Sequence, residues 1–202
     1  MNIAVFVSGN GSNLQAIIDA EHSGNLSDGE IKLVVCDQPD AFALIRAQKA
    51  DIPVFLQEGK GYTSREEYDQ AIIQRLKKDE IELIILAGFM RILSRHFVNE
   101  YKNKILNIHP ALLPDFKGAN GIKDAYEANV DVTGVTVHFV TEELDSGPVI
   151  LQEKVPIEKD ETLEELEEKI HKVEHEMYPQ AVRMFVDGEI VKSAPNFGRN
   201  HP

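Results

Sequence analysis

Residues 3–18, IAVFVSGNGSNLQAII, decide the fold that the sequence predicts. Residues 3–7 are all apolar, which is typical of a strand buried on both faces of a parallel sheet. A glycine loop and a helix follow, and this order leaves backbone N–H groups and the positive end of a helix dipole free for an anion. Because Leu14 replaces the third glycine of a dinucleotide fingerprint, the loop favours a phosphate monoester. The alternative is a tight turn in which Ser12 or Asn13 caps the helix.

Outward from this stretch, apolar runs alternate with helical segments. Further strands are expected at 31–36, 53–56, 82–87 and 105–109, with helices at 41–49 and from Ser64 onward. This alternation predicts an α/β fold with a single doubly wound, Rossmann-like, mostly parallel sheet.

The chain changes character after residue 109. A short helix is expected at 123–129, and strands at 133–140 and 149–152 are joined too closely for a crossover helix. These two strands should therefore pair antiparallel. A capping box at Thr162 opens a long C-terminal helix, which Pro179 should kink or interrupt.

Composition limits the class of protein. No linker or repeat divides the chain, so we expect one domain over residues 1–192 and a polar tail at 193–202. The formal net charge of −13 argues against non-specific nucleic-acid binding, which needs a basic face. The single cysteine suits a reducing compartment. Without a signal peptide or membrane span in the sequence, we expect a cytoplasmic protein with no membrane partner.

Asn107 and His109 end the strand expected at 105–109, and Pro110 stops it. Alternate strand residues share a face, so an amide and an imidazole should lie together at a carboxyl strand end, where open α/β sheets bind ligands. If Asp145 packs there, its charge would favour the imidazolium and raise the pKa of His109. The alternatives are a turn contact for Asn107, a hydrogen-bonded strand-end histidine, and an aspartate that caps a Gly-Pro turn.

A second strand-end loop, residues 88–93, is apolar. It offers a slot for a flat heteroaromatic ring, lined by Phe89, Met90, Ile92 and Leu93. The alternative is that these are core residues that begin a helix. Arg65 lies in the first turn of its helix, where the dipole favours acids, so it is a candidate contact for an anionic ligand. The alternative there is an ordinary solvated arginine.

His171, Glu174 and His175 match the H-x-x-E-H pattern of inverted zincins. The two histidines should share a helix face, but a catalytic zinc needs a third protein ligand, and the sequence offers no clear one. We therefore expect no metal site. Glu174 could instead accept hydrogen bonds from sugar hydroxyls.

Five motifs together resemble the phosphoribosylglycinamide formyltransferase family of purine synthesis. They are SGNGSNL at 8–14, AGFMRIL at 87–93, NIHP at 107–110, LLP at 112–114 and LDSGP at 144–148. Asn-x-His-Pro with a later aspartate is shared by the wider folate-dependent formyltransferase superfamily, whereas GNGSN points to this family. The likeness runs from residue 1 to about 186. It implies the formyltransferase fold and transfer of a formyl group from 10-formyltetrahydrofolate to the amine of glycinamide ribonucleotide, without a metal.

The resemblance implies a role for each matching residue. Asn107 and His109 would stabilise the oxyanion, and Asp145 would orient His109 and favour its charged form. The ribonucleotide would be held by Gly11, Ser12, Asn13 and Glu174. The folate would contact Arg65, Met90, Arg91, Ile92, Leu93, Asn107, Asp145 and the rest of the 141–145 turn.

On the same basis, residues 1–103 form a phosphate-binding half and residues 104–192 a catalytic and folate-binding half of a monomer or homodimer. Lys117 departs from the family, since many relatives carry proline there, and this bears on closure of the 115–121 loop and contacts to the folate tail. Three alternatives remain: a formyltransferase for tRNA or an amino sugar, a formyltetrahydrofolate hydrolase, and a non-catalytic sugar-phosphate sensor.

Overall fold

The apolar runs form one seven-stranded sheet in the computed structural model, which describes residues 1–190. The strand order is β3-β2-β1-β4-β5-β6-β7. Strands β1 to β5 are parallel, β6 is antiparallel to β5, and β7 is antiparallel to β6. The strands are β1 Asn2–Val7, β2 Glu30–Cys36, β3 Val54–Leu56, β4 Leu83–Leu86, β5 Ile105–His109, β6 Val132–Phe139 and β7 Val149–Pro156. The predicted mostly parallel α/β sheet with an antiparallel C-terminal part is confirmed.

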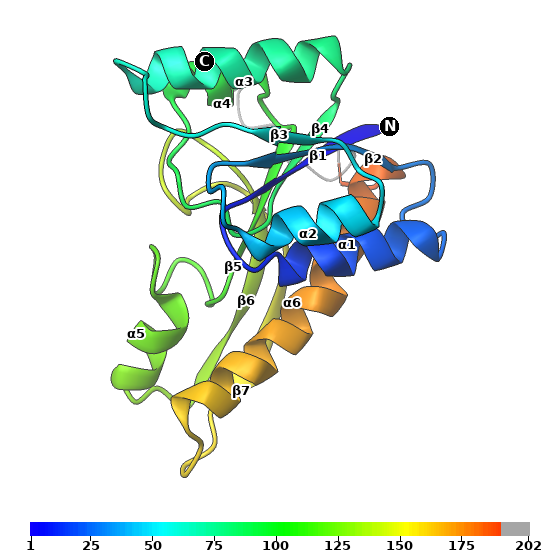
Figure 1. Cartoon of the computed structure of the whole chain (residues 1–202). Helices are drawn as coiled ribbons and strands as arrows, with labels where there is room; N and C mark the ends of the chain where they lie inside the picture. The colour runs from blue at the N-terminus through cyan, green and yellow to red at the C-terminus, as the bar shows by residue number, and fades with distance from the viewer. Residues whose placement is uncertain (191–202) are drawn as a thin grey trace, which may run out of the picture.

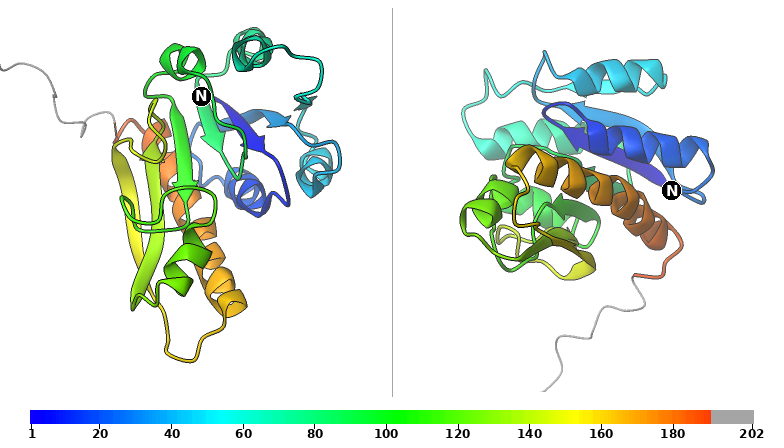
Figure 2. Two further views of the ribbon diagram at one scale, coloured as in Figure 1. Left: turned by 90° about the vertical axis from the view of Figure 1, so that its left-hand side faces the viewer. Right: turned by 90° about the horizontal axis from the view of Figure 1, so that it is seen from below.

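Helices cover both faces of this sheet (Figure 1). They are α1 Ser12–His22, α2 Phe42–Lys49, α3 Arg65–Lys78, α4 Arg95–Glu100, α5 Gly121–Glu127 and α6 Leu163–Val186. One core lies under α1, α2 and α6, and the other under α3 and α4. Alternate residues of β1 enter each core, as expected of a strand buried on both faces. In the second half of the chain, α5, β6, β7 and the start of α6 project past the strands and helices of the first half (Figure 2).

The predicted interruption of the C-terminal helix is wrong, because α6 continues through Pro179. Proline removes the hydrogen bond to the carbonyl four residues earlier. Burial of the following turns against the sheet, through Ala181, Val182 and Phe185, compensates for that loss. The predicted capping box is confirmed: the Thr162 hydroxyl accepts from the Glu165 N–H, and the Glu165 carboxylate accepts from the Thr162 N–H.

Tyr178 ties α6 to the strands that carry the site. Its side chain is fully buried, and its hydroxyl lies 2.8 Å from the Leu86 carbonyl oxygen of β4 and 3.0 Å from the Leu106 carbonyl oxygen of β5. Between residues 1 and 190, no helix is long and apolar enough to cross a membrane. The tail expected at 193–202 lies outside the described residues.

Candidate active site

Strand β5 places Asn107 and His109 on one face of the sheet. Leu106 and Ile108 enter the core under α6, so the residues between and after them project to the opposite face. The strand ends at His109, immediately before Pro110, as the sequence predicts. Since β6 runs antiparallel to β5, His138 lies directly opposite Asn107.

Asp145 reaches the same place from the turn between β6 and β7. Its Oδ2 lies 3.7 Å from His109 Nδ1, and its Oδ1 lies 3.7 Å from His138 Nε2. Oδ2 also accepts a 2.9 Å hydrogen bond from the Gly118 N–H. Burial by itself would raise the pKa of Asp145, but the Gly118 N–H and the charge of His109 together hold it below its ordinary value. An ionised carboxylate therefore faces the imidazole of His109.

The turn that carries Asp145 depends on Gly147. A Cβ there would lie 1.7 Å from the Phe139 carbonyl oxygen, so no other residue fits this close approach of two backbones. Asp145 itself has a positive φ of 47°. The turn is thus shaped by one obligatory glycine and one residue in the left-handed region, and it directs the carboxylate toward β5.

The loop before α5 covers these groups with its backbone. His109 Nε2 donates a 2.8 Å hydrogen bond to the Phe116 carbonyl oxygen, which leaves Nδ1 facing Asp145. Lys117 Nζ donates to Ser146 Oγ at 2.6 Å and joins the loop to the turn after β6. A substrate that uses His109 Nε2 must therefore replace the Phe116 carbonyl.

The glycine loop after β1 opens the N-terminus of α1. Gly11 is the N-cap residue, with a φ of 74°, and a Cβ there would lie 2.7 Å from the Ala43 Cβ. The predicted side-chain cap from Ser12 or Asn13 is wrong, because α1 begins at Ser12 and has no side-chain cap. The N–H groups of its first turn are thus not taken by a capping side chain. Arg46 of α2 steadies the loop by donating to the backbone and side-chain oxygens of Asn10, both at 2.9 Å.

Glu174 of α6 lies beside this helix terminus. Its Oε2 accepts a 3.3 Å hydrogen bond from Asn13 Nδ2 and lies 2.9 Å from His171 Nδ1. Glu174 is buried, and its hydrogen bond and charge raise the pKa of His171 against the opposing effect of burial. Asn13 Oδ1 is buried without a hydrogen-bond partner in the described structure. A carboxylate and an unpaired amide oxygen therefore flank the start of α1.

The loop after β4 connects the two regions. Its Gly88 carbonyl accepts from the Ser8 N–H at 3.1 Å, and its Met90 N–H donates to Ser8 Oγ at 2.9 Å. The side chains of Met90 and Ile92 are 70% and 60% exposed. An apolar pair that stays open to solvent at a strand end is available to a flat apolar ligand.

The remaining residues of the predicted folate contact set lie in different surroundings. Leu93 is buried in the core under α3 and α4. The guanidinium of Arg91 lies over the Tyr68 ring, 4.2 Å from its centroid. Arg65 begins α3 and is exposed, with Ser64 as the capping residue that the sequence predicts.

Comparison with known proteins identifies the family to which the chain belongs. The model of the formyl transferase family matches residues 1–182. The chain belongs to the formyl transferase family. The predicted resemblance is therefore confirmed at the level of the family.

Individual relatives and solved structures support the same family assignment. The phosphoribosylglycinamide formyltransferase of Bacillus subtilis is 44% identical over 183 residues, which are 91% of this chain and 93% of that protein. The trifunctional purine biosynthetic protein adenosine-3 of Chironomus tentans is 47% identical over 93% of this chain, which spans only 14% of that longer protein. The crystal structure of phosphoribosylglycinamide formyltransferase from Bacillus halodurans superposes with a TM-score of 0.89 at 41% identity, and 98% of each chain is covered.

Within this formyl transferase, the motif that resembles inverted zincins has other contacts. The rings of His171 and His175 stack with centroids 6.3 Å apart, so they do share a helix face. His171 is engaged by Glu174. Across the described part of the chain, no three or more His, Cys, Asp or Glu residues are grouped so that they could hold a metal ion.

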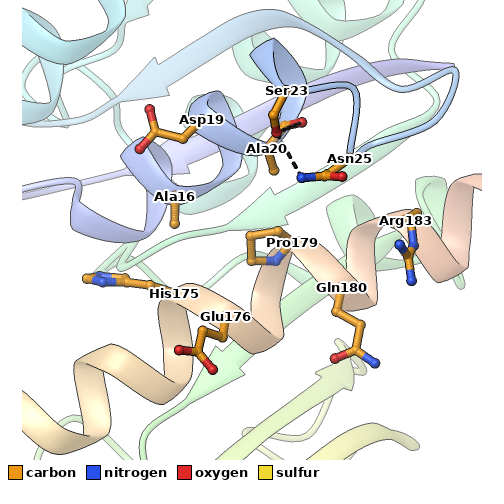
Figure 3. A pocket seen from close by; sticks show the side chains of 10 residues that line it. All are labelled: Ala16, Asp19, Ala20, Ser23, Asn25, His175, Glu176, Pro179, Gln180 and Arg183. Carbon is orange, nitrogen blue, oxygen red and sulfur yellow. Dashed lines mark hydrogen bonds between the residues drawn. The ribbon is translucent and has the colours of Figure 1, made fainter.

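His175 faces a different feature, a pocket of about 460 Å³ between α1 and α6 (Figure 3). It is lined by Ala16, Asp19, Ala20, Ser23, Asn25, His175, Glu176, Pro179, Gln180 and Arg183. None of these is a predicted catalytic or ligand-binding residue. Burial lowers the pKa of His175, despite the opposing charge of Glu174. The pocket is thus separate from the polar cluster on β5.

The structure brings together Asn107, His109 and Asp145, and separately Gly11, Ser12, Asn13 and Glu174. It also shows residues that the sequence interpretation missed. His138 contacts both Asn107 and Asp145, and Arg46 anchors the glycine loop. The available sequence signal for His138 is the alternation along residues 133–140, which places Thr136 and His138 on the same face of β6. Nothing in the sequence near Arg46 connects it with Asn10.

Proposed function

We propose that this chain transfers the formyl group of 10-formyltetrahydrofolate to the amine of 5′-phosphoribosylglycinamide, a step of purine (IMP) biosynthesis. The observation that carries the proposal is the grouping of Asn107, His109 and Asp145 in a formyl transferase in which the N-terminus of α1 has no capping side chain. In the sheet, only β4 lies between β1, which leads to that terminus, and β5, which carries the pair. An anionic group at α1 and a reacting group at β5 can then belong to one substrate.

The ribonucleotide phosphate binds at the start of α1. The N–H groups after Gly11, the hydroxyl of Ser12 and the amide of Asn13 can donate to its oxygens, and the dipole of α1 favours its charge. Glu174 is placed to accept hydrogen bonds from the ribose hydroxyls. The local donors therefore allow a strongly acidic protein to bind a phosphate.

The chemistry follows from the groups on β5. The substrate amine attacks the formyl carbon, and negative charge develops on the formyl oxygen. Asn107 as an amide donor and His109 as an imidazolium stabilise that oxygen. The C–N10 bond then breaks, N10 of the folate gains a proton, and the new amide nitrogen loses one, with His109 as the carrier. No metal is needed in this sequence of steps.

Asp145 supports His109 in two ways. Its ionised carboxylate lies 3.7 Å from Nδ1 and can stabilise positive charge that develops on the ring during proton transfer. It also fixes the direction of the ring.

The folate binds along the exposed side chains of Met90 and Ile92 and the 141–145 turn, with Arg65 and Arg91 available to its anionic tail. Both substrates are small molecules, and the assembly is a monomer or homodimer in the cytoplasm.

The decisive experiment is a formyl-transfer assay in a chelator. Loss of the formyl group from 10-formyltetrahydrofolate, or from its dideaza analogue, is followed by absorbance with and without the ribonucleotide. Turnover that requires the ribonucleotide is expected. Turnover without it would identify a hydrolase, and ribonucleotide binding without turnover would identify a sensor. His109→Ala should abolish turnover while ribonucleotide binding, measured by calorimetry, changes little.

A further inference from the structure

A histidine on β6 lies behind the amide of Asn107. His138 is 1% exposed, and its Nε2 lies 3.2 Å from Asn107 Nδ2. Its Nδ1 lies 2.9 Å from the Phe139 carbonyl oxygen. The charged group that faces the ring is Asp145, 3.7 Å from Nε2, which is too long for a well-formed hydrogen bond. The close partners of His138 are therefore one carbonyl and one amide.

These two partners fix the protonation of the ring. A carbonyl oxygen only accepts, so Nδ1 carries a hydrogen. An amide nitrogen only donates, so Nε2 has none and accepts from Asn107. The hydrogen-bond pattern thus places a hydrogen on Nδ1 and leaves Nε2 as the acceptor. If the Asn107 amide were reversed, its oxygen would face Nε2, and this would require a hydrogen on Nε2 in addition to the one on Nδ1.

The acceptor at Nε2 determines what Asn107 offers to a substrate. Nδ2 carries two hydrogens, and His138 takes one of them. Among the described residues, no other group accepts a hydrogen bond from Nδ2. The second hydrogen therefore remains for the oxygen of a formyl group, in an orientation that His138 sets and that a freely rotating amide would hold only part of the time.

We infer that His138 is a positioning residue for formyl transfer, which acts by holding the Asn107 amide with its nitrogen toward the reacting carbonyl. This inference rests on the proposed function of Asn107 as an oxyanion donor. His138 itself touches no reacting atom. Its contribution should therefore be to kcat, should depend on an acceptor at the position of Nε2, and should vanish when Asn107 is absent.

Two substitutions of His138 separate the effect of its hydrogen-bond acceptor from the effect of its packing. His138→Leu removes the acceptor, and kcat should fall about 10- to 100-fold, less than the 10²–10³ lost with an oxyanion donor itself, while the ribonucleotide KM stays within about twofold. His138→Gln offers a side-chain oxygen to Asn107 and should recover most of the loss. Thr133→Val is the control on the same strand, because its buried hydroxyl has no hydrogen-bond partner in the described structure, and it should keep wild-type kcat.

A double-mutant cycle tests the route of the effect. In an Asn107→Ala background, His138→Leu should cause no further loss of kcat. An equal loss in both backgrounds would overturn the inference, because His138 would then act independently of Asn107. Wild-type kcat in His138→Leu would overturn it as well, and so would a His138→Gln variant that is folded but as slow as His138→Leu.

A measurement on the unaltered protein is independent of how the variants fold. In the ¹⁵N-labelled chain at neutral pH, NMR should show His138 with a protonated Nδ1 and an unprotonated Nε2. An imidazolium or the opposite tautomer would overturn the inference. If the wild-type protein transfers no formyl group, the proposed function fails on its own, and this spectrum still decides the orientation of the amide.

Discussion

Asp145→Asn is the sharpest test of the electrostatics of the site. The substitution keeps the shape of the side chain and can keep an acceptor for the Gly118 N–H, but it removes the negative charge beside His109. The side chains of Asp145 and His109 are only 7% and 5% exposed, so solvent screens their interaction weakly. The loss of charge should therefore act directly on the positive charge that the proposed mechanism places on His109.

The distance sets the size of the effect. At 3.7 Å, unit charges interact by about 4 kcal/mol with an effective dielectric constant of about 20. A barrier raised by about 4 kcal/mol corresponds to about a 10³-fold lower rate, because each 1.36 kcal/mol is tenfold. The ribonucleotide KM should change little, since the proposed phosphate site is at α1 and not at Asp145.

The assay is steady-state formyl transfer at saturating concentrations of both substrates. Glu153→Gln serves as the matched control, because it removes one negative charge from an exposed position of β7, the strand that follows the turn of Asp145. It should retain wild-type kcat. Thermal unfolding of both variants shows whether Asp145→Asn remains folded. A folded Asp145→Asn protein with kcat within about threefold of wild type would refute the electrostatic account.

Three further predictions concern binding, stability and pH. Gly11→Ala should weaken ribonucleotide binding at least tenfold by calorimetry, because the new Cβ would meet the Ala43 Cβ at 2.7 Å and strain a φ of 74°. Tyr178→Phe should lower the free energy of unfolding in urea by about 1–3 kcal/mol, since the carbonyls of β4 and β5 lose a buried donor. The pKa of His171 is raised by Glu174, so protonated His171 adds stability that is complete below its ordinary pKa and is lost as the pH rises through the raised value. His171→Gln should remove that pH dependence of unfolding and leave metal-free turnover intact.

Most helices and strands could be predicted from the sequence because the patterns that indicate them are local. An apolar run of five residues gave β1 and a shorter apolar run gave β5, and a period of two placed Asn107 and His109 on one face. Boundaries moved by one or two residues, except that β7 continues to Pro156, well past the expected end at residue 152. Its exposed residues carry no strong strand signal, and pairing along β6 holds them in the sheet.

The wrong and missing predictions depended on tertiary structure. A side-chain cap needs an extended N-cap residue, whereas Gly11 adopts a left-handed conformation that contact with Ala43 reserves for glycine. Pro179 stays within α6 because the turns beyond it are buried. His138 was missed because its role depends on the register between β5 and β6. That register fixes which polar residue of β6 stands opposite Asn107, and sequence alone does not specify it.

The antiparallel strand β6 explains why the proposed chemistry lies at β5. A further parallel strand would need a crossover helix, which would cover one face of the sheet with apolar side chains. Here Val135 and Val137 of β6 pack toward α6, while Thr136 and His138 face the opposite side. On that side the coverings are polar loops: the Thr136 hydroxyl donates to the Ala111 carbonyl at 2.7 Å and accepts from the Leu113 N–H at 3.1 Å. Residues of β5 therefore have on one side the apolar core that fixes them and on the other side backbone groups that a substrate can replace.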